Sequence, residues 1–171
     1  GWSDDHLRAI DKIESAVLRG GLFAMAMPRG SGKPTLAETA CTWSLLYGHH
    51  AVVCLIASTA EHAAGLLESI QVELETNDLL LEDFPEAVYP IHKLERITQR
   101  TKGQLYLGEP TRITWTSTEI VMPTIYGSAA SGAALRVEGI GGAVRGMERE
   151  LADGGSIRPE LVVGDGPHPE G

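Results

Sequence analysis

The sequence is poor in the features that mark several classes of protein. It has two cysteines, Cys41 and Cys54, which are too few for a disulfide framework and do not form a C-x-x-C metal-binding pair. No apolar run approaches the roughly 20 residues that span a bilayer, and residues 1–5 lack the basic start of a signal sequence. We therefore expect a cytoplasmic protein without disulfide bonds.

Positive charge is also scarce. A formal net charge of −9 and a pI near 5.1 argue against broad binding to nucleic acids, so a contact to DNA would need a local basic strip. The sequence offers one strip, Lys93, Arg96 and Arg100, on the outer side of a short helix that we predict around residues 91–100. This strip is either a solvated helix face or a contact to a DNA backbone.

What the chain does contain indicates one domain of the α/β class. Its 171 residues are 43% hydrophobic and 22% charged, which is ordinary for a globular domain. Residues 51–57 are apolar throughout, as in a parallel strand covered on both faces, and Ser58-Thr59-Ala60-Glu61 is typical of a capping box before a helix. The predicted order is a helix over residues 5–19, a strand over 22–27, a helix over 34–47, the strand over 51–57 and a helix to about residue 74. Connections of this length predict a mainly parallel sheet with helices on both faces.

The second half of the chain has weaker patterns. Phe84-Pro85 and Tyr89-Pro90 indicate turns or extended backbone, and residues 113–122 predict a β-hairpin insertion. Residues 127–146 are rich in glycine, alanine and serine, which indicates flexible loops around a strand near residues 135–140.

The chemically most informative stretch follows the first predicted strand. Pro28-Arg29-Gly30-Ser31-Gly32-Lys33 lies between an apolar run and a helical pattern, which is the layout of a phosphate-binding (Walker A) loop. Glycines let backbone N–H groups converge on phosphate oxygens, the lysine reaches the β- and γ-phosphates, and a helix N-terminus favours an anion. Met27 replaces the first glycine of the pattern and Pro34 replaces its final serine or threonine. An ordinary Gly-Ser-Gly turn before a helix is therefore the alternative.

Pro34 removes two groups that a nucleotide site uses. The residue at this position normally gives its hydroxyl to Mg²⁺ and its amide to phosphate, and proline has neither group. Thr35 carries a hydroxyl, but one residue further on lies about 100° around the helix. We therefore place Thr35 among the nucleotide-binding residues, without the metal-binding role, and expect weakened Mg²⁺ binding.

A second apolar run ends in a carboxylate. Residues 161–165 predict a strand that delivers Asp165 at its carboxyl end, where a Walker B aspartate holds Mg²⁺ beside the phosphates of ATP. We therefore expect Lys33 and Asp165 to belong to one nucleotide-binding site. Hydrolases of this type usually carry a second carboxylate that activates the attacking water, but Gly166 stands in that place.

At this point the chain resembles the N-terminal ATPase domain of the large terminase subunits of tailed bacteriophages. The resemblance covers about residues 20 to 168. It rests on the glycine-rich loop, Trp43-Ser44-Leu45-Leu46-Tyr47-Gly48, Glu75-Thr76-Asn77-Asp78-Leu79-Leu80 with Phe84-Pro85-Glu86, Arg145-Gly146-Met147, and Ile157-Arg158-Pro159-Glu160-Leu161-Val162-Val163-Gly164-Asp165. It implies an additional-strand P-loop fold and an ATP-driven motor that translocates double-stranded DNA as a homo-oligomeric ring on a viral procapsid. The implied partners are the portal and the small terminase subunit, in the cytoplasm of a bacterial host.

The resemblance also implies roles for individual residues. Lys33 matches the lysine on the phosphates, Arg29 an extra transition-state cation, and Asp165 the magnesium aspartate. Gly30, Ser31 and Gly32 match the phosphate cradle, and Pro28 is also placed among the nucleotide-binding residues. The family's nuclease domain is absent from residues 1–171, so we expect a single ATPase-like domain, truncated just after the Walker B-type strand, that does not cut DNA. Pro34 and Gly166 depart from the family pattern and predict impaired hydrolysis.

Two other interpretations stay open. One is a non-catalytic, truncated prophage remnant that keeps the P-loop fold, and the other is an unrelated P-loop NTPase, such as a helicase-like or small-molecule kinase domain. Lys33 and Asp165 favour an ATPase, whereas Pro34 and Gly166 favour the remnant.

Overall fold

The computed structural model describes residues 21–25, 33–48, 52–154 and 161–165. The predicted helix over residues 5–19 lies outside these ranges. The described elements, in chain order, are β1 (Gly21–Met25), α2 (Lys33–Tyr47), β2 (Val52–Ala57), α3 (Ala60–Thr76), α4 (Asp78–Asp83), α5 (Pro85–His92), the 3₁₀ helix η1 (Thr98–Thr101), β3 (Leu105–Tyr106), β4 (Glu109–Pro110), β5 (Thr114–Trp115), β6 (Glu119–Val121), β7 (Ala134–Gly139), α6 (Ile140–Ala152) and β8 (Leu161–Asp165).

The core of the fold is a mixed sheet with the strand order β1-β8-β2-β7-β6-β5. The four strands from β1 to β7 pair in parallel, and β6 and β5 continue the sheet with antiparallel pairing. A separate small antiparallel hairpin joins β3 to β4. The expectation of an α/β fold with a mainly parallel sheet is thus confirmed, and the predicted hairpin insertion is an extension of this sheet.

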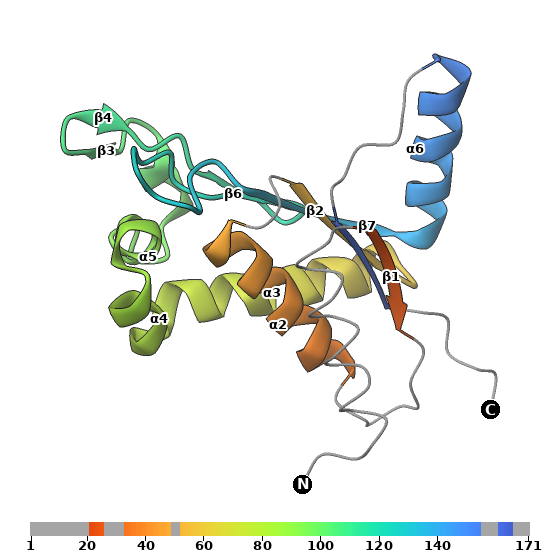
Figure 1. Cartoon of the computed structure of the whole chain (residues 1–171), viewed down its shortest axis with the longest axis horizontal. Coiled ribbons are helices and arrows are strands. Elements are labelled where there is room, and N and C mark those ends of the chain that lie inside the picture. The colour runs from red at the N-terminus through yellow and green to blue at the C-terminus, as the bar shows by residue number, and fades with distance from the viewer. Residues whose placement is uncertain (1–20, 26–32, 49–51, 155–160, 166–171) are drawn as a thin grey trace, which may run out of the picture.

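The connections place helices on opposite sides of the sheet. The chain steps in one direction from β1 through α2 to β2 and on through α3 to β7, and then returns through α6 to β8. Because parallel crossovers are right-handed, a reversal of direction moves the connecting helix to the other face. In Figure 1, α2 and α3 lie together below the sheet and α6 stands on the opposite side.

The main core lies between the sheet and the pair α2 and α3. Leu45 of α2, Leu67 of α3, Leu55 of β2 and Leu135 of β7 are all fully buried there. Along β2, however, burial alternates: one face is buried, and the side chains of the other face, including Cys54, are half-buried. The prediction of a strand covered on both faces therefore holds, with unequal cover, since among the described helices only α6 stands on the second side of the sheet and it rises from the end of β7 (Figure 1).

The basic strip predicted at Lys93, Arg96 and Arg100 does not form. The helix α5 ends at His92, and the positive φ angles of Glu95 and Arg96, 50° and 63°, interrupt helical geometry before η1. The three cations then point to different partners: Arg96 Nε lies 3.8 Å from Glu75 Oε2, Arg100 Nη1 lies 3.3 Å from Glu95 Oε1, and Lys93 Nζ lies 5.3 Å from the centre of the Tyr89 ring. They are separate surface contacts and share no helix face.

Three local predictions also need correction. Pro90 lies inside α5, where buried Val88 and Ile91 hold the helix against the core despite the missing N–H. The N-cap of α3 is Thr59, whose side chain accepts a hydrogen bond of 3.1 Å from the His62 N–H, one residue later than the predicted capping box. Residues 140–152 form α6, although glycines weaken its helical propensity.

Candidate functional site

The strand before the predicted loop and the strand that ends in Asp165 finish side by side at the carboxyl edge of the sheet. β1 and β8 are adjacent and parallel, and Met25, the last residue of β1, is the register partner of Asp165, the last residue of β8. Neighbouring strands lie about 4.8 Å apart, so the two strand ends are neighbours in space. α/β sheets bind their ligands at this edge.

Lys33 is the first residue of α2 and so lies at the N-terminus of this helix. The first turn of α2 contains no acidic residue, which leaves the partial positive charge of the helix N-terminus free to attract an anion. Pro34 lies in this first turn, a position that tolerates proline. At this helix start Pro34 supplies neither a hydroxyl group nor an amide hydrogen.

Much of the predicted loop lies outside the described residues. This applies to Pro28, Arg29, Gly30, Ser31 and Gly32, and also to Gly166. For Lys33, Thr35 and Asp165 the structure places the backbone in α2 and β8. Their predicted contacts with phosphate and metal remain predictions.

The resemblance also implied an additional strand in the sheet. In the described part of the chain, β1 pairs directly with β8, and no strand separates the strand before the loop from the strand that ends in Asp165.

A basic cavity of about 760 Å³ lies further along the same edge of the sheet; we call it the arginine cavity. Gly139 ends β7 beside the N-terminus of α3, and a Cβ at this glycine would lie 2.6 Å from the Ala60 nitrogen, so glycine permits the close approach. The cavity is lined by Ala60, Thr116, Thr118, Glu119, Arg136, Val137, Glu138, Gly139, Gly142, Arg145 and Arg149.

Two of the three arginines in this cavity are available to a ligand. Arg136 is engaged, because its Nε donates to Glu119 Oε2 at 2.7 Å. Arg145 and Arg149 lie one turn apart on the exposed side of α6, and neither forms an ion pair with a described carboxylate. The sequence alone did not predict this basic surface, because the glycines of α6 weaken its helical pattern. The available signal was the spacing of Arg145 and Arg149 by four residues.

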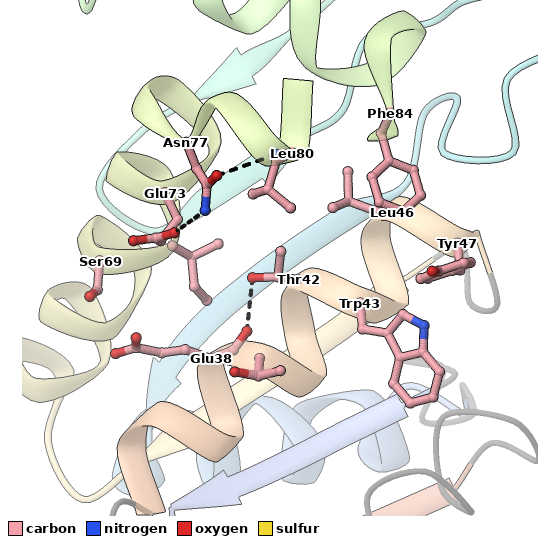
Figure 2. A pocket seen from close by; sticks show the side chains of 12 residues that line it. Glu38, Thr42, Trp43, Leu46, Tyr47, Ser69, Glu73, Asn77, Leu80 and Phe84 are labelled. Carbon is pink, nitrogen blue, oxygen red and sulfur yellow. Dashed lines mark hydrogen bonds between the residues drawn. The ribbon is translucent and has the colours of Figure 1, made fainter. Parts of the chain in front are cut away.

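A third site lies between helices α2, α3 and α4, where a cavity of about 470 Å³ opens; we call it the interhelix cavity (Figure 2). Burial is the main reason that the pKa of Glu38, on α2, rises above its ordinary value of 4.5. The nearby charge of Glu73, on α3, raises the pKa further, whereas a hydrogen bond with Ser69 opposes the rise.

The two cysteines lack the properties of catalytic thiols. Cys41 is fully buried, and burial raises the pKa of its thiol far above the ordinary value. Burial also raises the pKa of Cys54 to about 11. Since the thiolate is the nucleophile, neither side chain is activated for covalent chemistry near pH 7.

The described residues contain neither a cluster of metal-ligating side chains nor a membrane-spanning helix. No three or more His, Cys, Asp or Glu side chains gather there in a way that could hold a metal ion. None of the helices placed there combines the length and the apolar character needed to cross a membrane.

Comparison with known proteins gives no match: no family model, no curated protein and no solved structure is significantly similar to this chain.

The raised pKa of Glu38 predicts a gain in stability when its charge is removed. A carboxyl group whose pKa is higher in the folded state destabilises the fold once pH exceeds the unfolded value. We expect Glu38→Gln to increase the free energy of unfolding at pH 7, by less than about 1 kcal/mol because the group is partly screened by solvent. The gain should disappear below the ordinary pKa of 4.5, where the carboxyl is protonated in both states.

Urea denaturation at pH 7 and pH 4 measures this effect. Glu82→Gln is the matched control, because Glu82 is an exposed carboxylate on α4 outside the cavity. A loss of stability in Glu38→Gln at pH 7, with the control unchanged, would contradict the account.

Proposed function

We propose that this chain is the P-loop ATP-binding domain of a DNA-packaging motor of the phage terminase large-subunit type, and that it hydrolyses ATP poorly. The observation that carries the proposal is the register of β1 and β8, which pairs Met25 with Asp165 at the carboxyl edge of the sheet. In P-loop NTPases the phosphate loop and the metal-holding aspartate converge in this way.

The proposed site assigns a separate task to each group. The backbone of Gly30, Ser31 and Gly32 cradles the phosphates together with the N-terminus of α2, and Lys33 neutralises the β- and γ-phosphates. Arg29 supplies a further positive charge in the transition state, by resemblance to the terminase family. Pro28 and Thr35 border the nucleotide on either side of this cradle.

Magnesium fits the proposed site only in part. Asp165, at the end of β8, is the residue that would hold the ion, and a bound Mg²⁺ would supply charge stabilisation to the phosphates. Pro34, in the first turn of α2, cannot provide the hydroxyl ligand. Gly166 cannot act as the base that activates water. Nucleotide binding with slow hydrolysis is the expected combination.

A specific observation supports the alternative of an unrelated P-loop NTPase. The terminase resemblance implies an additional strand, whereas β1 and β8 pair directly. The third candidate, a non-catalytic prophage remnant, is supported by the two lost catalytic groups at Pro34 and Gly166. The experiments below separate these candidates by nucleotide binding, by hydrolysis and by DNA binding.

Double-stranded DNA is the proposed polymer substrate of the motor, and the arginine cavity is its proposed contact. Arg145 and Arg149 present two charges on one side of α6. The cavity that they line includes the carboxyl end of β7, and β7 lies three strand spacings, or roughly 14 Å, from β1 in the sheet. The portal, the small terminase subunit and further copies in a ring are proposed partners by resemblance alone.

Nucleotide binding is the first test. We expect the chain to bind a fluorescent ADP or ATP analogue, and we expect Mg²⁺ to change the Kd by less than about tenfold, or about 1.4 kcal/mol. Lys33→Ala should remove binding, because the lysine neutralises the phosphates. Lys102→Ala, which removes an exposed cation after η1, is the control and should bind as the unmodified chain does. Unchanged binding by Lys33→Ala would exclude the loop as the site.

Restored hydrolysis is the second test. A positioned general base contributes typically 10² to 10⁴ in rate, and a metal ligand contributes separately. We expect Pro34→Thr and Gly166→Glu to stay near background as single variants, since groups that act as one unit are strongly non-additive. The double variant should hydrolyse ATP measurably faster than the Lys33→Ala control in a phosphate-release assay. Rapid hydrolysis by the unmodified chain would contradict the proposed roles of Pro34 and Gly166.

DNA binding is the third test. Replacing Arg145 and Arg149 together by glutamine should weaken binding to a DNA duplex at low salt. It should also reduce the slope of log K against log salt by about two, since each phosphate contact contributes about 0.9. The matched control is the double variant Lys93→Gln with Arg100→Gln, which removes the same charge outside the cavity. Fluorescence anisotropy over a salt series measures both, and an equal loss in the control would exclude a localised contact.

A further inference from the structure

The interhelix cavity has two chemically different ends. Figure 2 shows the side chains of Glu38, Ser69 and Glu73 toward one end and the rings of Trp43, Tyr47 and Phe84 toward the other. Leu46, Ile70 and Leu80 complete the apolar part of its lining. A ligand that fits such a cavity needs a polar head and an apolar body.

The aromatic end is built by edge-to-face packing. The ring centres of Trp43 and Tyr47 are 5.8 Å apart with an interplanar angle of 86°, and those of Tyr47 and Phe84 are 5.1 Å apart at 83°. This geometry joins α2 to the residue between α4 and α5 and gives the cavity a firm wall. Aromatic rings favour both apolar groups and cations.

The polar end carries negative charge without a compensating cation. Among its twelve lining residues are two carboxylates, Glu38 and Glu73, and no lysine, arginine or histidine. Glu73 accepts one hydrogen bond, from Asn77 Nδ2 to Oε2 at 2.9 Å. The Glu38 carboxylate has a hydrogen bond with Ser69, and Thr42 donates its hydroxyl to the Glu38 backbone carbonyl at 2.8 Å, so both partners of Glu38 in the cavity are uncharged.

We propose that the interhelix cavity binds an organic cation, an ammonium or guanidinium group carried on an apolar or aromatic body. The carboxylates of Glu38 and Glu73 receive the charged head, and Trp43, Tyr47 and Phe84 receive the body. The volume of about 470 Å³ lies within the range of small-molecule sites. This proposal uses residues 38–84 and does not depend on nucleotide binding at Lys33 and Asp165.

The destabilising charge of Glu38 agrees with a binding role. The partly buried Glu38 and the exposed Glu73 lie on facing helices, and the charge of Glu73 raises the pKa of Glu38, so a bound cation would relieve this repulsion. A bare metal ion fits less well, because two carboxylates with aromatic neighbours offer too few oxygen ligands. The occupant is therefore an organic cation, either a free amine or an arginine or lysine side chain of a partner protein.

The test is a titration of the full chain with probes matched in shape and opposite in charge. Tryptamine is the cationic probe and indole-3-propionate is the anionic one, each followed by isothermal calorimetry. Acetyl-arginine amide, as a third probe, represents a partner's side chain. We expect tryptamine to bind with a Kd on the order of 1 mM or tighter and the anion not to bind.

Variants locate the binding. Glu38→Gln should weaken tryptamine binding at least about tenfold, which is the loss of one charge-assisted contact of about 1.4 kcal/mol. Glu82→Gln should leave the affinity within about twofold. Since Glu38→Gln is also expected to stabilise the fold, a loss of binding in that variant would not reflect unfolding. Tyr47→Leu, which removes a ring with half its surface exposed, should weaken tryptamine more than acetyl-arginine amide.

Each outcome decides the proposal. Tighter binding of tryptamine than of acetyl-arginine amide supports a free amine, and the reverse order supports a partner's side chain. Equal binding of the cation and the anion would overturn the proposal, as would unchanged affinity in Glu38→Gln. Absence of binding by both cations up to about 10 mM would overturn it as well.

Discussion

The parallel pairing of β1 with β8 is the constraint on which the proposed site depends. Residues 25 and 165 lie at opposite ends of the chain, yet the pairing makes them register partners. β8 also pairs with β2, so it fills the space between the first two strands of the chain. Without this insertion, the start of α2 and the carboxylate strand would have no common edge. All the other described elements lie between β1 and β8 in the sequence, so the proposed site is complete only once β8 has joined the sheet.

The sequence predicted the elements of the α/β core better than their arrangement. Apolar runs marked β2 and β8, and the spacing of apolar residues marked α2 and α3, because each is a local pattern. The position of β8 between β1 and β2 has no local signal, since strand order arises from packing over the whole chain. Prediction also failed where packing overrides propensity, as it does at Pro90 in α5 and at the glycines of α6.

The same distinction applies to the functional surfaces. A contiguous motif predicted the phosphate loop, although its middle lies outside the described residues. The strip Lys93, Arg96 and Arg100 failed because the prediction assumed a helix that positive φ angles interrupt. The interhelix cavity could not be predicted, since its charged and aromatic ends combine side chains from three helices. Burial, which sets the pKa of Glu38, is likewise a property of the packed fold.

The described surfaces differ in charge: the carboxyl edge of the sheet carries positive groups, and the interhelix cavity carries negative ones. The edge at Lys33 and the arginine cavity lie at the carboxyl ends of the parallel strands, where helix N-termini and arginines attract anions. The interhelix cavity carries carboxylates on the helices below the sheet. In this chain of net charge −9, both of the anion-binding surfaces that we propose thus lie at one edge of the sheet. This separation lets the nucleotide and the organic cation be tested independently in one chain.

Chemical-shift mapping with ADP tests the central claim most directly. In a ¹H–¹⁵N spectrum of the ¹⁵N-labelled chain, the account predicts that ADP shifts the amides of Gly30, Ser31, Gly32 and Lys33 together with that of Asp165. Amides around Glu38 and Glu73 should stay unchanged. Shifts in the loop without a change at Asp165, or shifts confined to another part of the chain, would contradict a nucleotide site built on the pairing of β1 with β8.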